Sequence, residues 1–393
     1  MLRLRLLLFA ALPFLVGHSL MADDNNFAVG SCKPRLTSFA TISAAVSGVP
    51  AGSTIFVCPG VYAEQVTITQ PLKLQGISSA NQDQAIISVP SAALGSPIAS
   101  LFLESVAVQV LVQTTGWVEI SNLTVDGTGG DLGCASNTWL AGIFFAPGSS
   151  GRISRVKVAN QTNGGCGVGI WSENGNNTNQ SLEVEDSSVR DMDGFGIFAG
   201  GLSSPGPHVS LHDNVVAPAA ALGGIVLANV SGNIGENDVS NAFFGIANVG
   251  PGASISSNTV TLTNAGVVLE GGGNALSNRI SGSNVGVLFF ADGGRAQGNH
   301  ITAVSAAGIE FNCHAASASH NTINDALVGL DQVPAAFNGS NSFANTATII
   351  VGGCAAAAVA PATAMRTMAA SAASSVSSIR QYRTPFSPNG QIK

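Results

Sequence analysis

The sequence predicts an all-β fold in which short strands stack as a solenoid, a parallel β-helix. Of the 393 residues, 45% are hydrophobic, only 9% are charged and 47 are glycine. This composition favours short strands and tight turns over helices or a disordered chain. A glycine followed by Ile, Val or Leu recurs at gaps of 20 to 28 residues between Gly142 and Gly329. Because neither a leucine ladder nor a helical stretch accompanies this period, we predict coils of about 21 residues built from short strands.

Two markers define each coil. The glycine steps stand at Gly142, Gly169, Gly196, Gly224, Gly245, Gly266, Gly286, Gly308 and Gly329. An asparagine followed within two residues by Val or Ile keeps the same pace at Asn214, Asn237, Asn258, Asn278, Asn299 and Asn321. We predict that the asparagine amides hydrogen-bond one another at one bend of every coil, where Asn tolerates left-handed geometry. The glycines are predicted to mark another bend where a side chain would clash, so both markers are interpreted as scaffold.

The two ends of the chain differ from the repeat. Two arginines, an apolar run and a small residue before two aspartates predict a secretory signal peptide at the N-terminus. No other apolar run approaches about eighteen residues, so no membrane span is expected, and the protein is predicted to be secreted or periplasmic. The predicted segments are a signal peptide at 1–22, an N-terminal cap at 23–50, the β-helix at 51–354 and a flexible Ala/Ser-rich tail at 355–393.

Charge and cysteine content constrain the partners and the compartment. Without Arg3 and Arg5 of the signal peptide, 13 basic and 22 acidic residues give a net charge of 13 − 22 = −9. No basic stripe is visible, so nucleic acid is not an expected partner. An even number of cysteines in an exported chain predicts disulfides, with fifteen possible pairings of six cysteines. We favour the pairing of neighbours, Cys32–Cys58, Cys134–Cys166 and Cys313–Cys354.

Several motifs resemble a known group of proteins. The repeats SNTV…AGVVL and GNHI…AGIEF look like the right-handed parallel β-helix repeats of the pectate-lyase-like superfamily. The segment AAVSGVPAGSTIFVCPGVYAEQVTITQPLKLQGIS at 44–78 is similar to the first coils of that superfamily, pectin methylesterases included. The resemblance covers roughly residues 40–350 and implies a single-stranded, right-handed β-helix.

The resemblance implies no single chemistry, because NosD-like copper-maturation proteins and many carbohydrate-active enzymes share these repeats. The catalytic motifs of pectin methylesterases, polygalacturonases and alginate epimerases are absent from this sequence. No Cys/Met/His cluster supports copper maturation. These activities therefore cannot be carried over.

The coils at 117–198 are predicted to form the working face. Glycine gaps of 27 and 28 indicate extra loop residues there, and loops carry function more often than scaffold does. All three tryptophans and 13 of the 37 charged residues fall within 117–193. His208 and His212, just beyond, bracket a strand and are interpreted as solvated turn positions rather than metal ligands.

Alternation along the strands predicts an aromatic strip on this face. If the Ile of each glycine step points inward, the next residue points outward, which stacks Phe144, Trp171 and Phe198 on successive coils. Exposed rings would suit the C–H faces of sugars, and these three are the candidate substrate-binding residues. The alternative is that inserted loops fold back and bury the rings. The same outward position continues through residues 226–288 as Val, Ala, Val and Leu, which indicates a covered or partner-facing stripe.

Candidate catalytic residues lie beside the glycine step at 196. Asp191, Asp193 and Arg190 could act on a polysaccharide, because hydrolysis needs two carboxylates and β-elimination needs a base and charge neutralisation. Asp126, Asp131 and Glu173 on neighbouring coils are candidate ligands of a calcium ion. The alternative for Asp191 and Asp193 is an ordinary turn role.

The predicted function is that of an exported β-helix protein that binds or processes a polysaccharide. If it is an enzyme, a polysaccharide lyase or glycoside hydrolase is expected. The rival hypothesis is a non-catalytic, adhesive surface rod that contacts other proteins along the stripe at 226–288.

Overall fold

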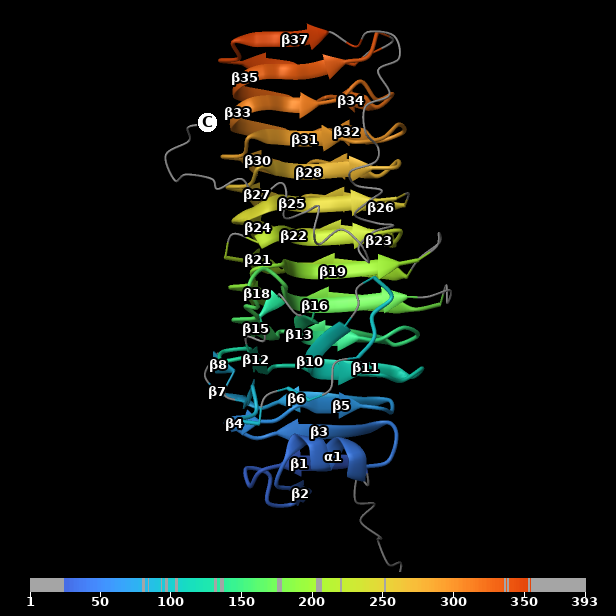
Figure 1. Ribbon diagram of the computed structural model, residues 1–393, viewed down its shortest axis with the longest axis vertical. Helices are drawn as coiled ribbons and strands as arrows, with labels where there is room; N and C mark the ends of the chain where they lie inside the picture. Colours follow the sequence, from blue (N-terminus) through green and yellow to red (C-terminus); the bar gives the residue numbers. More distant parts are fainter. Residues whose placement is uncertain are drawn as a thin grey trace, which may run out of the picture.

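The computed structural model describes residues 25–354, apart from 80–81, 84, 93, 96–97, 103–104, 131–132, 135–137, 175–178, 203–206, 220, 251, 336, 338 and 353. The predicted signal peptide and tail lie outside the described residues. Within them, strands stack in coils along one axis, and a helix lies at the N-terminal end (Figure 1). Strand pairing in both large sheets is parallel, so the predicted parallel β-helix is confirmed.

The strands of the coils form three faces of the stack. The first face is a sheet of its own, which we call sheet A. Its strands, in sheet order, are β2 (Thr37–Phe39), β1 (Asn26–Val29), β3 (Ser53–Val57), β6 (Leu72–Gly76), β11 (Trp117–Ser121), β14 (Ser150–Ser154), β17 (Ser181–Glu185), β20 (His208–His212), β23 (Ser231–Gly235), β26 (Ala253–Ser256), β29 (Asn274–Leu276), β32 (Arg295–Gln297) and β34 (Ser317–Ser319).

The other two faces share a second sheet. The short-strand face holds β4 (Gly60–Ala63), β9 (Ala85–Ser88), β12 (Thr124–Asp126), β15 (Lys157–Ala159), β18 (Ser188–Arg190), β21 (Val215–Ala217), β24 (Asp238–Ser240), β27 (Thr259–Thr261), β30 (Arg279–Ser281) and β36 (Ser342–Ala344). The long-strand face holds β5 (Val66–Ile68), β10 (Ser105–Val112), β13 (Thr138–Phe145), β16 (Gly167–Asn174), β19 (Phe195–Gly201), β22 (Ala221–Ala228), β25 (Ala242–Val249), β28 (Ala265–Glu270), β31 (Val285–Phe289) and β37 (Thr348–Gly352).

Two strands run through both of these faces without a break, β33 (His300–Glu310) and β35 (Thr322–Val333). A small antiparallel hairpin, β7 (Ser78–Ser79) and β8 (Gln82–Asp83), interrupts the stack near its N-terminal end. The described part of the chain contains no helix long and apolar enough to cross a membrane.

Inward-facing aliphatic side chains from the three faces fill the axis of the stack. On sheet A, for example, Ile120, Ile153 and Val184 follow one another in register and are fully buried. Alternation along each strand places every second side chain in this core, which is the main source of stability for a stack of thin coils.

The asparagine ladder is confirmed and is longer than predicted. Each Asn Nδ2 from Asn214 to Asn321 donates to the Oδ1 of the next Asn at 2.8 to 2.9 Å, and the last acceptor is Asn341. At the N-terminal side the ladder ends at Ser187, whose backbone N–H donates to Asn214 Oδ1 and whose hydroxyl accepts from Val156 N. The buried amides thus bond to one another across consecutive coils.

The left-handed backbone geometry lies one residue earlier than predicted. Asp213, Glu236 and Ser257, which precede the ladder asparagines, have φ values of 58°, 58° and 59°. The ladder side chain must point into the stack to reach the amides above and below it. The preceding, outward-facing residue therefore takes the left-handed turn.

The glycine steps lie inside the long strands rather than at a bend. A Cβ at Gly224 would overlap the side chain of Val239 and lie 2.6 Å from the carbonyl oxygen of Gly245. The predicted clash is therefore correct, but its cause is close packing between the long and short strands. It is not a left-handed turn.

The ends of the stack are fixed by a helix and by disulfides. Helix α1 (Ile42–Gly48) is capped by the Thr41 side chain, and Ile42 lies buried against the first coils. The carboxylate of Glu64 accepts from the backbone N–H of Ile42 at 2.8 Å. All three predicted disulfides are formed: Cys32–Cys58, Cys134–Cys166 and Cys313–Cys354.

Candidate functional site

The aromatic strip predicted on the early coils exists but is covered. Phe144, Trp171 and Phe198 lie in register on β13, β16 and β19, with ring centroids 5.8 and 5.2 Å apart. All three rings are buried, and Trp171 is only 1% exposed. The prediction of an exposed sugar-binding strip is therefore wrong, and the alternative of buried rings is confirmed.

Part of the cover comes from residues 98–102, which precede β10. Phe102 packs edge-to-face on Phe198 with ring centroids 5.5 Å apart, and Ile98 forms an antiparallel bridge with Val106. On the other side of the cluster, Trp139 stacks on Phe195 at 5.5 Å. These contacts remove the strip from water and make it a second apolar core outside the coil.

Glu173, a predicted calcium ligand, holds this cover in place. Its carboxylate is 0% exposed and accepts from the backbone N–H of Leu101 at 2.8 Å and from the Ser100 hydroxyl. Burial raises the pKa of Glu173 above its ordinary value, and the hydrogen bonds from Leu101 and Ser100 offset only part of that effect. The carboxylate therefore ties residues 100–101 to the end of β16.

Asp126 lies on a different face of the coil from Glu173. Its Oδ1 accepts from Thr128 N at 3.0 Å, Thr128 Oγ1 at 2.7 Å and Asn160 Nδ2 at 2.9 Å. Partial burial raises the pKa of Asp126, but these hydrogen bonds together lower it below its ordinary value. The predicted calcium site is therefore not assembled from Asp126 and Glu173, and Asp131 lies outside the described residues. Among the described residues, no group of three His, Cys, Asp or Glu could hold a metal ion.

Asp193 fixes a loop. Its carboxylate oxygens accept from the backbone N–H groups of Asn163, Gly165 and Gly167 at 2.7 to 2.8 Å. The same loop is joined to residue 134 through the disulfide of Cys166. Three backbone donors on one carboxylate indicate a structural loop anchor.

Asp191 fits the turn alternative, whereas Arg190 is the last residue of β18. Asp191 follows β18 with a φ of 61°, in the left-handed region that Asp and Asn adopt readily in turns. Arg190 Nε donates to the hydroxyl of Ser188 at 2.8 Å on the same short strand. Asp193 anchors the neighbouring loop, so the described contacts of these three residues are local ones within a turn, a strand and a loop.

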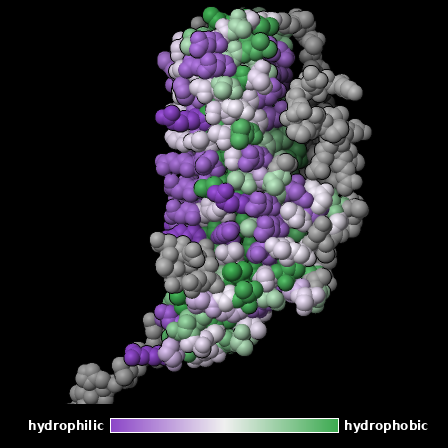
Figure 2. Space-filling view, turned by 90° about the vertical axis from the view of Figure 1, so that its left-hand side faces the viewer, coloured by the Kyte–Doolittle hydropathy of each residue, from purple (hydrophilic) through white to green (hydrophobic). Residues whose placement is uncertain are grey.

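A different surface carries exposed and charged groups in register. We call it the platform, the outward-facing residues of β11, β14, β17 and β20 on sheet A. Hydrophilic residues also gather in a column along the stack on the side that carries the short strands (Figure 2). The platform residues are Trp117, Glu119, Ser121, Ser150, Arg152, Ser154, Ser181, Glu183, Glu185, His208, Ser210 and His212.

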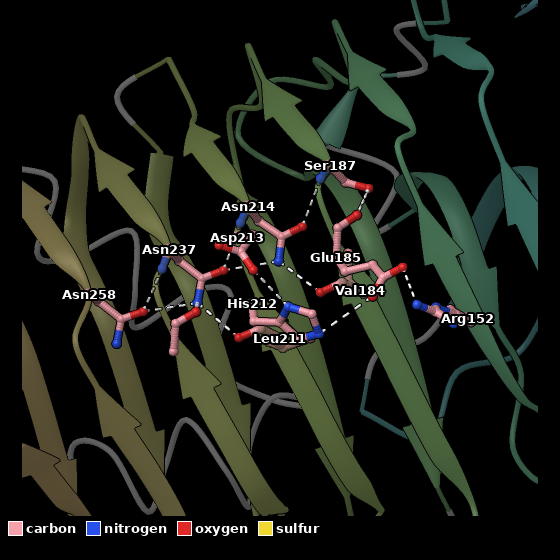
Figure 3. Close-up of polar contacts among 11 residues, drawn as sticks. Arg152, Val184, Glu185, Ser187, Leu211, His212, Asp213, Asn214, Asn237 and Asn258 are labelled. Atoms are coloured by element: carbon pink, nitrogen blue, oxygen red, sulfur yellow. Dashed lines mark hydrogen bonds and ion pairs between the residues drawn. The ribbon is translucent and has the colours of Figure 1, made fainter. Parts of the chain in front are cut away.

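Arg152 lies at the centre of an ionic network on the platform (Figure 3). Its Nη2 pairs with Glu185, and its Nε lies 3.9 Å from the Glu183 carboxylate. The hydrogen bond that Arg152 donates to Glu185, more than any other contact, raises the pKa of Arg152. His212 continues the network, since its Nε2 lies 3.6 Å from Glu185 and its Nδ1 lies 3.0 Å from Asp213.

Trp117 borders this network and is 37% exposed. It pairs in register with Ser150 on β14. The next coil adds Ser181, which donates its backbone N–H to the Ser150 hydroxyl at 3.0 Å and pairs with His208. A row of small serines thus runs from the indole to an imidazole, beside the charged row of Glu119, Arg152 and Glu183.

The charged residues of the platform are evident in the sequence, but their common position on one face is not. Arg152 and Glu185 are 33 residues apart, and the uneven lengths of the early coils hide their register. Strand alternation in WVEIS, GRIS and SLEVE, aligned on their inward aliphatic residues, is the signal that could have found the platform.

Comparison with known proteins identifies the fold and nothing finer. No protein-family model matches the sequence, and no curated protein matches it. A mannuronic acid specific polysaccharide family 6 lyase from human gut microbiota is 11% identical, with a TM-score of 0.53 and coverage of 81% of this chain and 82% of the lyase chain.

Two further solved structures are similar to this chain at lower TM-scores. The A-module of mannuronan C-5 epimerase AlgE6 from Azotobacter vinelandii is 17% identical, with a TM-score of 0.42 and coverage of 79% and 93%. Pectin methylesterase PemA from Erwinia chrysanthemi is 11% identical, with a TM-score of 0.34 and coverage of 83% and 92%. At these identities the likeness to the lyase supports the parallel β-helix fold, and no activity follows from it.

Proposed function

We propose that this is an exported protein that binds a polysaccharide on the platform of sheet A. The observation that carries the proposal is an exposed indole, Trp117, beside rows of hydrogen-bonding side chains held at fixed strand spacing. Apolar sugar faces pack on aromatic rings, while Glu, Arg, Ser and His side chains can bond to ring hydroxyls. The platform positions recur at a regular strand spacing along the stack, as sugar units recur along a polysaccharide chain.

The rigidity of the platform supports binding. Its side chains stand on paired parallel strands, and Arg152 is held by two carboxylates. A site whose groups are already oriented loses little conformational freedom when a ligand binds.

The charge of the platform favours a neutral polysaccharide. Glu119, Glu183 and Glu185 outnumber Arg152, and the mature chain as a whole is acidic. A polyuronate would therefore meet like charge on approach. A neutral glucan, mannan or galactan is the expected class.

The same charges favour binding over bond cleavage. Hydrolysis of a glycosidic bond requires one carboxyl group that delivers a proton. Glu183 and Glu185 face the same guanidinium, an arrangement that suits them as acceptors of hydrogen bonds. Polysaccharide lyase or glycoside hydrolase activity remains the alternative function, to be tested in the same experiment.

The test is a fluorescence titration of the protein from Asp23 onward with neutral and acidic polysaccharides. Trp139 and Trp171 are buried, so a change in emission should report mainly on Trp117. We expect saturable binding of a neutral polysaccharide, and Trp117→Ala should weaken it by about tenfold or more in affinity electrophoresis. Leu262→Ala, a change at a 64% exposed residue on another face, is the matched control.

Product formation is followed in parallel, with calcium and with a chelator, as ultraviolet absorbance of unsaturated sugars and as reducing ends. Retention without product would support the binding function. Retention that survives in both Trp117→Ala and Arg152→Gln would remove the platform from consideration, and product formation would establish an enzyme.

A further inference from the structure

A second outward-facing surface, on the long strands, is apolar and mostly buried. Val226, Ala247, Val268 and Leu288 follow one another in register on β22, β25, β28 and β31. We call this row, with Phe244, Val249, Ala265 and Val285 packed around it, the apolar stripe. It coincides with the stripe at 226–288 that the sequence predicts to be covered or partner-facing.

The burial of the apolar stripe implies that further atoms cover it on the outside of the coil. Val268, in the middle of the row, is 0% exposed although it points away from the axis. Among the partly buried side chains that pack against the stripe, Phe243 belongs to the start of β25 and Phe290 directly follows β31. Burial at the centre of an outer strand face needs atoms above that face.

The stripe turns acidic where it approaches the C-terminal end of the stack. The outward row continues from Leu288 in register to Glu310 and then to Asp331. The pKa of Glu310 is raised above its ordinary value. Burial is the larger cause, and the charge of Asp331 is the second. A cationic partner on this end of the stripe would relieve the repulsion between the two carboxylates.

The chain leaves the described structure at this acidic end. Cys354 is disulfide-bonded to Cys313, which lies three residues after Glu310. The 39 residues that follow, 355–393, contain four basic residues, Arg366, Arg380, Arg383 and Lys393, and no Asp or Glu. They also contain apolar residues throughout, among them Val359, Met365, Met368, Ile379 and Phe386.

Length permits this segment to reach the whole stripe. From β35 back to β22 there are five coil steps, roughly 24 Å at about 4.8 Å per step. An extended chain of the segment's length would span roughly 130 Å. The disulfide therefore delivers an apolar, purely basic segment to one end of an apolar stripe with an acidic end.

We propose that residues 355–393 dock on the apolar stripe of the same chain and form the layer that buries it. Apolar side chains of the segment pack on Val226, Val268 and Leu288, and its basic residues pair with Glu310 and Asp331. Docking within the chain is favoured over a second copy because the disulfide holds the segment at a high effective concentration. The inference is independent of the proposed polysaccharide platform, which lies on sheet A.

The test uses the full mature chain and limited trypsin digestion. Docking should protect Arg366, Arg380 and Arg383 from cleavage, since cleavage requires the segment to leave the stripe. Val268→Asp should speed cleavage at these sites by about tenfold or more, and Leu288→Gln is a milder second variant in case Val268→Asp misfolds. Leu262→Asp, on another face, should leave the rate unchanged.

Two further measurements determine whether residues 355–393 or a second copy of the chain covers the apolar stripe. High salt should speed tail cleavage if Glu310 and Asp331 hold basic residues, and sedimentation should show a monomer. Rapid cleavage that neither variant changes would overturn the proposal. A dimer that Val268→Asp dissociates, with the tail equally cleavable in both states, would assign the stripe to a second copy and also overturn it.

Discussion

Removing one amide from the middle of the asparagine ladder should destabilise the protein strongly. In Asn258→Ala, the backbone N–H of Asn237 loses the Oδ1 acceptor that it bonds at 3.0 Å. The Nδ2 bonds of Asn258 to Ile234 O and Asn278 Oδ1, both 2.9 Å, are lost as well. An orphaned buried N–H costs about 1–3 kcal/mol and each lost bond about 1 kcal/mol, so the free energy of unfolding should fall by about 3–5 kcal/mol.

Serine at the same place should cost less than alanine. At the natural end of the ladder the Ser187 hydroxyl accepts from Val156 N at 3.1 Å, so a serine can satisfy the backbone donor of the preceding coil. Asn258→Ser is therefore expected to retain about 1–2 kcal/mol relative to Asn258→Ala. Asn284→Ala, at an exposed asparagine whose side chain meets Ser305, is the matched control and should cost less than about 0.5 kcal/mol.

Guanidinium unfolding followed by far-ultraviolet circular dichroism measures these differences, provided that the slope with denaturant is unchanged between variants. Equal losses for the serine and alanine variants would refute the reasoning, because the orphaned N–H would then not be the dominant cost. A loss below about 1 kcal/mol for Asn258→Ala would show that coil stacking does not depend on the ladder.

Three further changes test the early coils. Burial raises the pKa of Glu173 above its unfolded value, so its contribution to stability is full at low pH and is lost as pH rises through the folded pKa; unfolding measured across pH should show Glu173→Gln gaining on the wild type as pH rises, and a constant difference would contradict this. The pKa of Asp126 is lowered, so its contribution is present above the unfolded value and is lost as pH falls through the folded pKa; the advantage of wild type over Asp126→Asn should shrink in acid, and an advantage that grows there would be inconsistent with the assigned hydrogen bonds. Asp193→Ala should speed amide hydrogen exchange in residues 163–167 by about tenfold while polysaccharide binding is unchanged; lost binding with unchanged exchange would return Asp193 to the functional site.

The fold was predictable because each coil contacts mainly the next one. A structural requirement at one position, such as the ladder amide at Asn237 or the close approach at Gly224, therefore recurs one coil later and appears in the sequence as a period. Strand alternation also placed Phe144, Trp171 and Phe198 correctly on the outer side of the coil.

The layer over these rings could not be predicted from the period. Ser100 reaches Glu173 across 73 residues, and no repeat relates the two. The platform was hidden for a related reason, because Arg152, Glu185 and His212 meet only when coils of unequal length are aligned on their inward residues. Asp126 and Glu173 were grouped because they were expected on neighbouring coils, although the structure places them on different faces of the stack.

The asparagine ladder does not by itself specify which coil stacks on which. Each amide from Asn237 to Asn321 would bond equally well to any other ladder asparagine, so a stack assembled one whole coil out of step would keep most ladder bonds. Only contacts that occur once distinguish the correct assembly from the shifted one, and these are concentrated where the repeat breaks down. Three such contacts are those of Ser187 with Asn214, of Asp193 with its loop and of Glu173 with residues 100–101. Each can form in only one alignment of the coils. The irregular early coils thus set the stacking alignment of the regular coils that follow them.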